Sequence, residues 1–134
     1  MAVVDATVLV EYLADAAQAE LARERLTRHR YRLWAPHLID AEVGHALRRH
    51  VRFGGLEAAD AEHALDELIA MELERVDHAA LLPRAWELRD NLSFYDALYV
   101  ALAEAIRQPL ITFDGRIAKA SGVQAEIEVL PQAA

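Results

Sequence analysis

The chain has 134 residues, of which 54% are hydrophobic, and 22 acidic residues against 14 basic ones give it a formal net charge of −8. This length suits one domain spanning residues 1–134, which is large enough to fold without a disulfide or a structural metal. The chain contains no cysteine, which excludes a disulfide framework, a thiolate zinc site and a cysteine nucleophile. The lack of disulfides fits the cytoplasm, where we expect the protein to reside.

Neither a targeting segment nor a membrane span is expected. Asp5 follows a short apolar run with no basic segment before it, so we expect no signal peptide. No apolar run approaches the ~18 residues that a membrane helix needs. The net negative charge is the wrong sign for a protein that binds nucleic acid through its bulk charge. An acidic protein can still act on RNA if a metal ion and a local row of arginines bind the phosphates, and every basic residue here except Lys119 is arginine.

Short apolar segments alternate with longer amphipathic ones along the chain. The apolar segments predict strands at residues 2–4, 32–35, 73–76, 110–113 and 127–130. The amphipathic segments predict helices at residues 7–13, 17–30, 38–53, 56–71, 79–91, 94–107 and 116–120. This alternation predicts a three-layer α/β/α sandwich with a mainly parallel central sheet.

Two acids stand where predicted strands end. Asp5 follows the first strand, and Asp114 follows the strand at 110–113. In open α/β sheets, the functional groups gather beyond the carboxyl ends of the strands. Thr7 and Thr112 lie two residues from these acids, and the Thr7 hydroxyl is placed to orient the Asp5 carboxylate. Each acid taken alone is equally well explained as a turn residue or a helix N-cap.

A third acid, Glu42, belongs to the predicted helix at 38–53. Glu42, His45, Arg49 and Arg52 share one face at helical spacing, beside an apolar stripe. A glutamate on a helix is usually just solvated, and that explanation suffices for Glu42 alone. The arginines that continue along the same face favour another interpretation, in which an RNA backbone leaves an acidic site along this helix.

The fourth acid, Asp96, lies in the first turn of an almost wholly apolar helix, which we therefore expect to be buried. One alternative is a capping box with Ser93 at the N-cap. Capping does not explain an acid among residues that bury on every side, because a buried and unpaired carboxylate is costly. The next basic residue in the sequence is Arg107, so a metal ion is the simplest partner for Asp96.

Taken together, the four acids predict a metal site at one edge of the sheet. Two carboxylates ~4 Å apart repel each other by about 4 kcal/mol at an effective dielectric constant of ~20. Such a cluster needs a cation or protons, and oxygen ligands without cysteine or paired histidines favour Mg²⁺, with Mn²⁺ as a substitute. Acids with Mg²⁺ serve phosphoryl transfer, in which the metal activates a water molecule. Arg116, directly after this edge, is the best candidate for a phosphate contact, followed by Arg49 and Arg52.

Four segments of the chain, in this order and at this spacing, carry a family resemblance. They read VVDATVLV from Val3, EVGHALRR from Glu42, YDALYVALAE from Tyr95 and LITFDGR from Leu110. With them the chain resembles the PIN-domain family over essentially its whole length. Within that family it is similar to the VapC-type toxins of bacterial toxin–antitoxin pairs.

The resemblance implies a metal-dependent endoribonuclease that acts as a toxin. It implies Asp5, Glu42, Asp96 and Asp114 as the catalytic quartet, with Asp5 and Asp96 as principal Mg²⁺ ligands. Asp114 and Glu42 would contribute directly or through water, and Thr112 would support the quartet. It also implies a homodimer that is held inactive by a cognate antitoxin, whose C-terminal segment lies across the active-site groove.

Other proteins also place acids at strand ends. A receiver-type phosphotransfer domain needs an acidic doublet and a lysine after a late strand, but Asp5 has no acidic neighbour and Lys119 lies in a predicted helix. A phosphatase of the haloacid dehalogenase type needs a second aspartate where Thr7 stands. A catalytically inactive PIN-like module that binds RNA or protein remains the alternative, and the complete quartet argues against it.

Overall fold

A parallel sheet forms the centre of the molecule in the computed structural model, which describes residues 1–132. Its strands are β1 (Ala2–Val4), β2 (Leu33–Pro36), β3 (Leu73–Val76), β4 (Leu110–Thr112) and β5 (Ile127–Val129). They are arranged in the order β3-β2-β1-β4-β5, and every neighbouring pair is parallel. The predicted parallel sheet is therefore confirmed.

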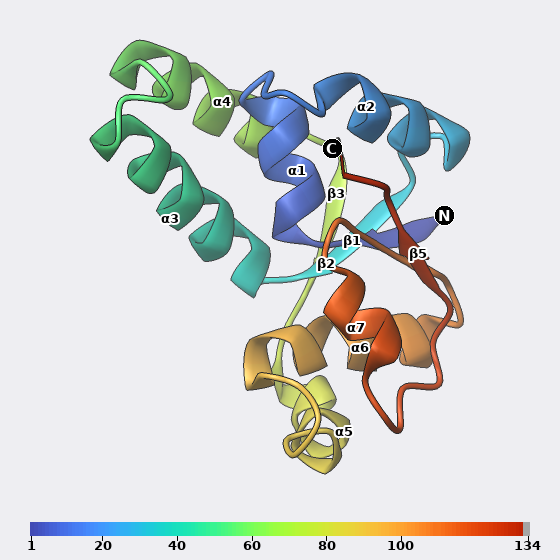
Figure 1. Ribbon diagram of the computed structural model, residues 1–134. Coiled ribbons are helices and arrows are strands. Elements are labelled where there is room, and N and C mark those ends of the chain that lie inside the picture. Colours follow the sequence, from blue (N-terminus) through green and yellow to red (C-terminus); the bar gives the residue numbers. More distant parts are fainter. Residues whose placement is uncertain (133–134) are drawn as a thin grey trace.

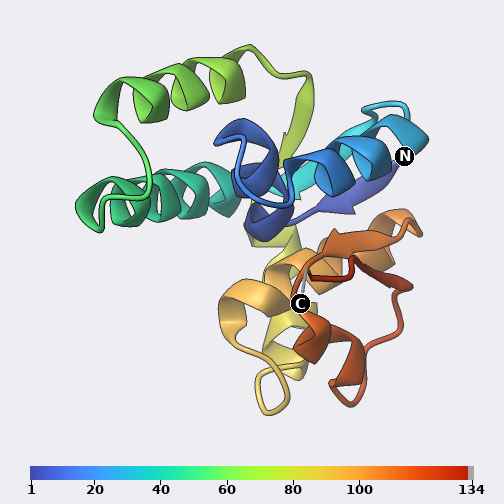
Figure 2. The same ribbon diagram turned by 45° about the horizontal axis from the view of Figure 1, so that its top comes forward.

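Helices cover both faces of the sheet, as the alternation of segments predicted. They are α1 (Ala6–Leu13), α2 (Ala19–Arg28), α3 (Leu38–Arg52), α4 (Ala58–Ala70), α5 (Leu82–Glu87), α6 (Phe94–Ile106) and α7 (Gly115–Lys119). Helices α1 to α4 lie on one side of the sheet and α5 to α7 on the other, a separation visible in two orientations (Figures 1 and 2). No helix among the described residues is long and apolar enough to span a membrane.

The prediction of one helix over residues 79–91 was wrong. A short 3₁₀ turn at Ala79–Leu81 comes first, α5 follows it, and turns complete the segment. Pro83 accounts for the break, because it has no N–H to donate and its ring clashes with the carbonyl group four residues earlier. A regular helix can therefore hold Pro83 only in its first turn.

Helix α6 is apolar on all sides because it is enclosed on all sides. Every residue of 97–103 is buried, and the helix packs across β1 and β2 on one side and against α5 on the other. Its Asp96 lies in the turn before this enclosed stretch. The burial that was predicted from composition is confirmed for residues 97–103 of the helix.

The order of the strands places the reversal of the winding between the neighbouring strands β1 and β4. From β1 the chain winds through β2 to β3, then crosses the opposite face through α5 and α6 and returns as β4 on the other side of β1. Ligand sites of open α/β sheets lie where the winding reverses in this way. Strand β2 leads into α3 at the same edge, and His78 Nε2 accepts a hydrogen bond from Leu38 N at 3.0 Å, which fixes the start of that helix.

Candidate active site

Asp5 is the most deeply buried of the four predicted acids, with 5% of its surface exposed. Its Oδ1 accepts hydrogen bonds from Thr7 Oγ1 at 2.5 Å and from Val8 N at 3.3 Å, and its Oδ2 accepts one from the Thr112 hydroxyl. Asp5 is thus the N-cap of α1. No ion pair within residues 1–132 involves it, and burial raises its pKa from 3.8 to about 6 although these hydrogen bonds lower it.

Two threonines join Asp5 to the loop after β4. The Thr7 hydroxyl, which donates to Asp5, accepts from Phe113 N at 3.0 Å. The Thr112 hydroxyl also donates to Asp5 and accepts from Asp114 N at 2.9 Å. Each hydroxyl therefore bonds both to the Asp5 carboxylate and to a backbone N–H group of the loop after β4. These bonds fix the position of Asp5 relative to Asp114.

Glu42 points from α3 toward the same edge, where it is paired with a tyrosine of α6. The Tyr99 hydroxyl donates to Glu42 Oε1 at 2.7 Å, and Tyr99 itself is buried. Burial raises the pKa of Glu42, the bond from Tyr99 lowers it, and the charge of Asp96 raises it. The available signal was the spacing of Asp96 and Tyr99, since residues three apart share a helix face.

Replacing this tyrosine gives a first prediction. Tyr99→Phe removes the donor, so the pKa of Glu42 is expected to rise, as a carbon-13 NMR titration of its carboxyl group would show. The free energy of unfolding is expected to fall by about 1 kcal/mol, because a partly buried carboxylate loses a hydrogen bond. Tyr95→Phe is the control for stability, since Tyr95 is exposed. An unchanged titration of Glu42 would contradict the assignment.

Asp96 is only half-buried, in contrast to the expectation from its apolar helix. Ser93 is the N-cap of α6 and its Oγ accepts from Asp96 N at 3.1 Å, so the serine half of the capping box is present. Burial raises the pKa of the Asp96 carboxyl, and the charge of Asp114 raises it further. The most deeply buried of the four acids is Asp5 instead.

Asp114 caps the short helix α7 and is bound by an arginine. Its Oδ1 accepts from Arg116 N at 3.0 Å and from Arg116 Nε at 3.0 Å, and its Oδ2 accepts from Arg116 Nη2 at 2.8 Å. This two-pronged ion pair lowers the pKa of Asp114. The Arg116 guanidinium is thus placed at the predicted acidic edge, paired with one of its members.

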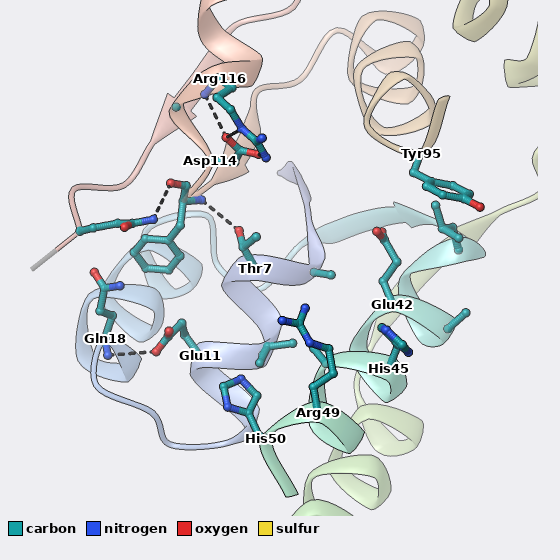
Figure 3. Close-up of a pocket in the computed structure, with 18 residues that line it drawn as sticks. Thr7, Glu11, Gln18, Glu42, His45, Arg49, His50, Tyr95, Asp114 and Arg116 are labelled. Atoms are coloured by element: carbon teal, nitrogen blue, oxygen red, sulfur yellow. Dashed lines mark hydrogen bonds and ion pairs between the residues drawn. The ribbon is translucent and has the colours of Figure 1, made fainter. Parts of the chain in front are cut away.

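A groove of about 1170 Å³ runs over this edge. Figure 3 shows Glu42, His45, Arg49 and His50 along α3 on one side, with Asp114 and Arg116 on the other and Thr7 between them. Arg49 extends from α3 into the space between the two sides (Figure 3). Arg52 is exposed one turn further along α3 and does not line the groove.

The family profile described as "PIN domain" matches residues 2–123. The chain belongs to the PIN-domain family. It is 43% identical over 129 residues to Ribonuclease VapC1 of Mycobacterium tuberculosis, with 96% of each chain covered. It is 40% identical over 134 residues to Ribonuclease VapC9 of the same species, with 98% of this chain and 100% of the relative covered. The described fold matches a chain of a toxin–antitoxin complex from Klebsiella pneumoniae with a TM-score of 0.71 at 16% identity, over 99% of this chain and 100% of that one.

The donor set of this PIN domain fits a hard divalent cation. The four acids offer only oxygen atoms, and Asp96 raises the pKa of both Asp5 and Glu42, which shows that the carboxylates act on one another. With the side chains as they stand, no three acidic or histidine groups of residues 1–132 are placed to hold a metal ion together. A shared cation would therefore need these carboxylates to turn toward it.

Proposed function

We propose that this PIN domain is a metal-dependent endoribonuclease that acts as the toxin of a VapBC-type pair. The observation that carries the proposal is a groove lined by Glu42 and Asp114, with two further acids beside it. Asp5 is buried, makes no ion pair within residues 1–132 and bonds to the groove residue Thr7, and Asp96 directly follows the groove residue Tyr95. The relatives at 40–43% identity over almost the whole chain carry the name ribonuclease, which supports RNA as the substrate.

The residues have separate tasks in this proposal. Asp5 and Asp96 would hold Mg²⁺, or Mn²⁺ in its place, and Asp114 and Glu42 would complete the set of ligands directly or through water. When bound, the ion would supply an activated water molecule and charge stabilisation for the leaving oxygen of a phosphodiester. The chain itself keeps the ligands in place, because Thr7 and Thr112 orient Asp5 and Tyr99 orients Glu42.

The groove also suggests how RNA is held. Arg49 and Arg116 face it from opposite sides, and guanidinium forks suit phosphate groups. Arg52 would meet the backbone further along α3. These local charges oppose the net charge of −8. We further propose that the protein acts in the cytoplasm as a homodimer, and that a cognate antitoxin inhibits it by placing its C-terminal segment across the groove.

Replacing Asp96 tests the proposal. Asp96→Asn keeps the shape of the side chain and the helix cap but removes a ligand charge, so Mg²⁺-dependent RNA cleavage is expected to fall by about 10²-fold. The measurement is sequencing of new RNA ends after incubation with Mg²⁺ and with a chelator. Asp90→Asn, at an exposed acid outside the groove, is expected to cleave at the parent rate. If the Asp96 variant cleaves at the parent rate, the proposed site is refuted. If the parent chain itself binds RNA and produces no new RNA ends, the result supports a non-catalytic module.

A further inference from the structure

Arg116 makes an ion pair with Asp114 that uses most of the acceptor capacity of that acid. Two guanidinium nitrogens bond to the two carboxylate oxygens at 3.0 and 2.8 Å, and the Arg116 backbone N–H adds a third bond at 3.0 Å. An ionised carboxylate has about four lone-pair sites, so about one remains. A metal ion that takes Asp114 as a ligand therefore competes with this fork for the carboxylate oxygens.

The same guanidinium also acts on a second site acid. Arg116 lowers the pKa of Asp114, and its charge partly offsets the rise that burial causes in the pKa of Asp96. Within residues 1–132, one ion pair involves any of the four acids, and Arg116 supplies its cation. The arginine therefore partly does what a divalent cation would do, which is to balance the negative charge at the mouth of the site.

The pair is built so that it can separate. The Arg116 side chain is 88% exposed, whereas Asp114 is largely covered. Exposed ion pairs contribute little to stability, because water solvates the charges when they part. Arg116 lies on the first turn of α7 at the wall of the groove, so its guanidinium can reach either inward to Asp114 or across the groove.

We propose that Arg116 is a displaceable counter-ion: it occupies Asp114 while the site lacks a metal ion, and it transfers to an RNA phosphate when a divalent cation takes its place. This inference rests on the proposed function and deepens it. In both states each charge has a partner: Asp114 pairs with Arg116 or with the cation, and Arg116 pairs with Asp114 or with the phosphate. A dication that draws in Asp114 repels the guanidinium, and the fork that fitted a carboxylate fits a phosphate equally well.

The exchange makes cation binding and RNA binding depend on each other. Without RNA, Arg116 competes with the cation for Asp114, so it weakens cation binding. With the cation bound, Arg116 is free and strengthens RNA binding. Because coupling between two ligands is reciprocal, RNA should strengthen cation binding by the same factor. Removal of Arg116 should therefore change the two affinities in opposite directions.

The first experiment measures Mn²⁺ binding without RNA, by calorimetry or by the electron paramagnetic resonance signal of free Mn²⁺. Arg116→Gln is expected to bind Mn²⁺ about 5-fold more tightly than the parent chain. Arg28→Gln is the matched control, since Arg28 is an exposed arginine paired with an exposed Glu24 on α2. It removes the same charge and is expected to leave Mn²⁺ affinity unchanged.

The second experiment measures the affinity for a fluorescent single-stranded RNA by anisotropy, in EDTA and in Ca²⁺, with a gel to confirm that the RNA stays intact. The parent chain is expected to bind RNA more tightly in Ca²⁺ than in EDTA. In Arg116→Gln this gain is expected to shrink by about 5-fold or more, with little change of affinity in EDTA, where Asp114 already holds the arginine.

The outcomes separate this inference from the function on which it rests. If Arg116→Gln binds Mn²⁺ as the parent does or more weakly, the counter-ion exchange is refuted while the metal site stands. An equal loss of RNA affinity in EDTA and in Ca²⁺ would also refute it, because Arg116 would then be a phosphate contact at all times. If the parent chain binds no Mn²⁺, the proposed metal site fails and the exchange fails with it.

Discussion

Asp5→Asn is expected to reduce RNA cleavage by about 10³-fold, because it removes the best-oriented charge of the proposed metal site. In a chelator at neutral pH the same variant is expected to be more stable than the parent chain by about 2 kcal/mol. Burial raises the pKa of Asp5 from 3.8 to about 6, and each unit of that difference corresponds to about 1.4 kcal/mol. Part of the gain is lost because the new amide group faces Thr112 Oγ1, which already accepts a bond from Asp114 N.

The pH dependence of this effect has a defined sign. The folded chain keeps the Asp5 proton up to about pH 6, whereas the unfolded chain releases it near its ordinary pKa of 3.8. The folded state thus binds more protons in this window, so the stability of the parent chain falls as the pH rises through it. The advantage of Asp5→Asn should therefore be absent near pH 4 and complete above pH 6 or so.

Urea denaturation at several pH values, with a chelator present, checks this expectation. Asp90→Asn serves as the control, since that exposed acid should show no such difference. A saturating divalent cation should remove the advantage of Asp5→Asn by stabilising only the parent chain. Loss of stability in the variant at neutral pH in chelator would mean that the hydrogen bonds of Asp5 outweigh the cost of burying its charge.

Thr112→Val is expected to lower both stability and activity. Thr112 is fully buried, and its hydroxyl bonds to Asp5 and to Asp114 N. Valine keeps the shape but leaves the Asp114 N–H without its partner and Asp5 Oδ2 without its donor. The free energy of unfolding is expected to fall by about 2 kcal/mol, and cleavage by about 10- to 100-fold.

Two further variants separate the hydroxyl group from the packing. Thr112→Ser restores the hydroxyl and removes a methyl group, so it should recover most of the cleavage while it remains somewhat less stable. Thr27→Val removes an exposed hydroxyl that bonds to the Arg23 carbonyl oxygen on α2, and its cleavage should equal that of the parent. If Thr112→Val cleaved RNA normally, the hydroxyl would have no part in holding Asp5.

The layers of the fold could be predicted from the spacing of apolar residues because burial imposes that spacing. The strand at residues 2–4 is apolar throughout, as is the stretch 97–103 of the helix at 94–107, and both stretches are enclosed in the structure. The prediction of one helix over 79–91 was wrong because the amphipathic pattern continues through the 3₁₀ turn before Pro83 and through the turns after Glu87, whereas only α5 is regular. The spacing of apolar residues indicates which face of a segment is buried, but it does not show where the backbone hydrogen bonds of a helix are interrupted.

Asp5, Glu42, Asp96 and Asp114 could each be singled out in the sequence by their place at a strand end or a helix start, since those positions follow from local pattern alone. The sequence also determined that the strands are parallel, because helices separate them. Only the tertiary structure decided which acid is deeply buried, that Tyr99 donates to Glu42, and that Arg116 occupies Asp114. The burial of Asp5 and the bond from Tyr99 to Glu42 depend on how distant segments pack. Arg116 is only two residues from Asp114, and there the side-chain direction decides. The acidic edge thus follows from the sequence, whereas the pairing of each carboxylate is a product of packing.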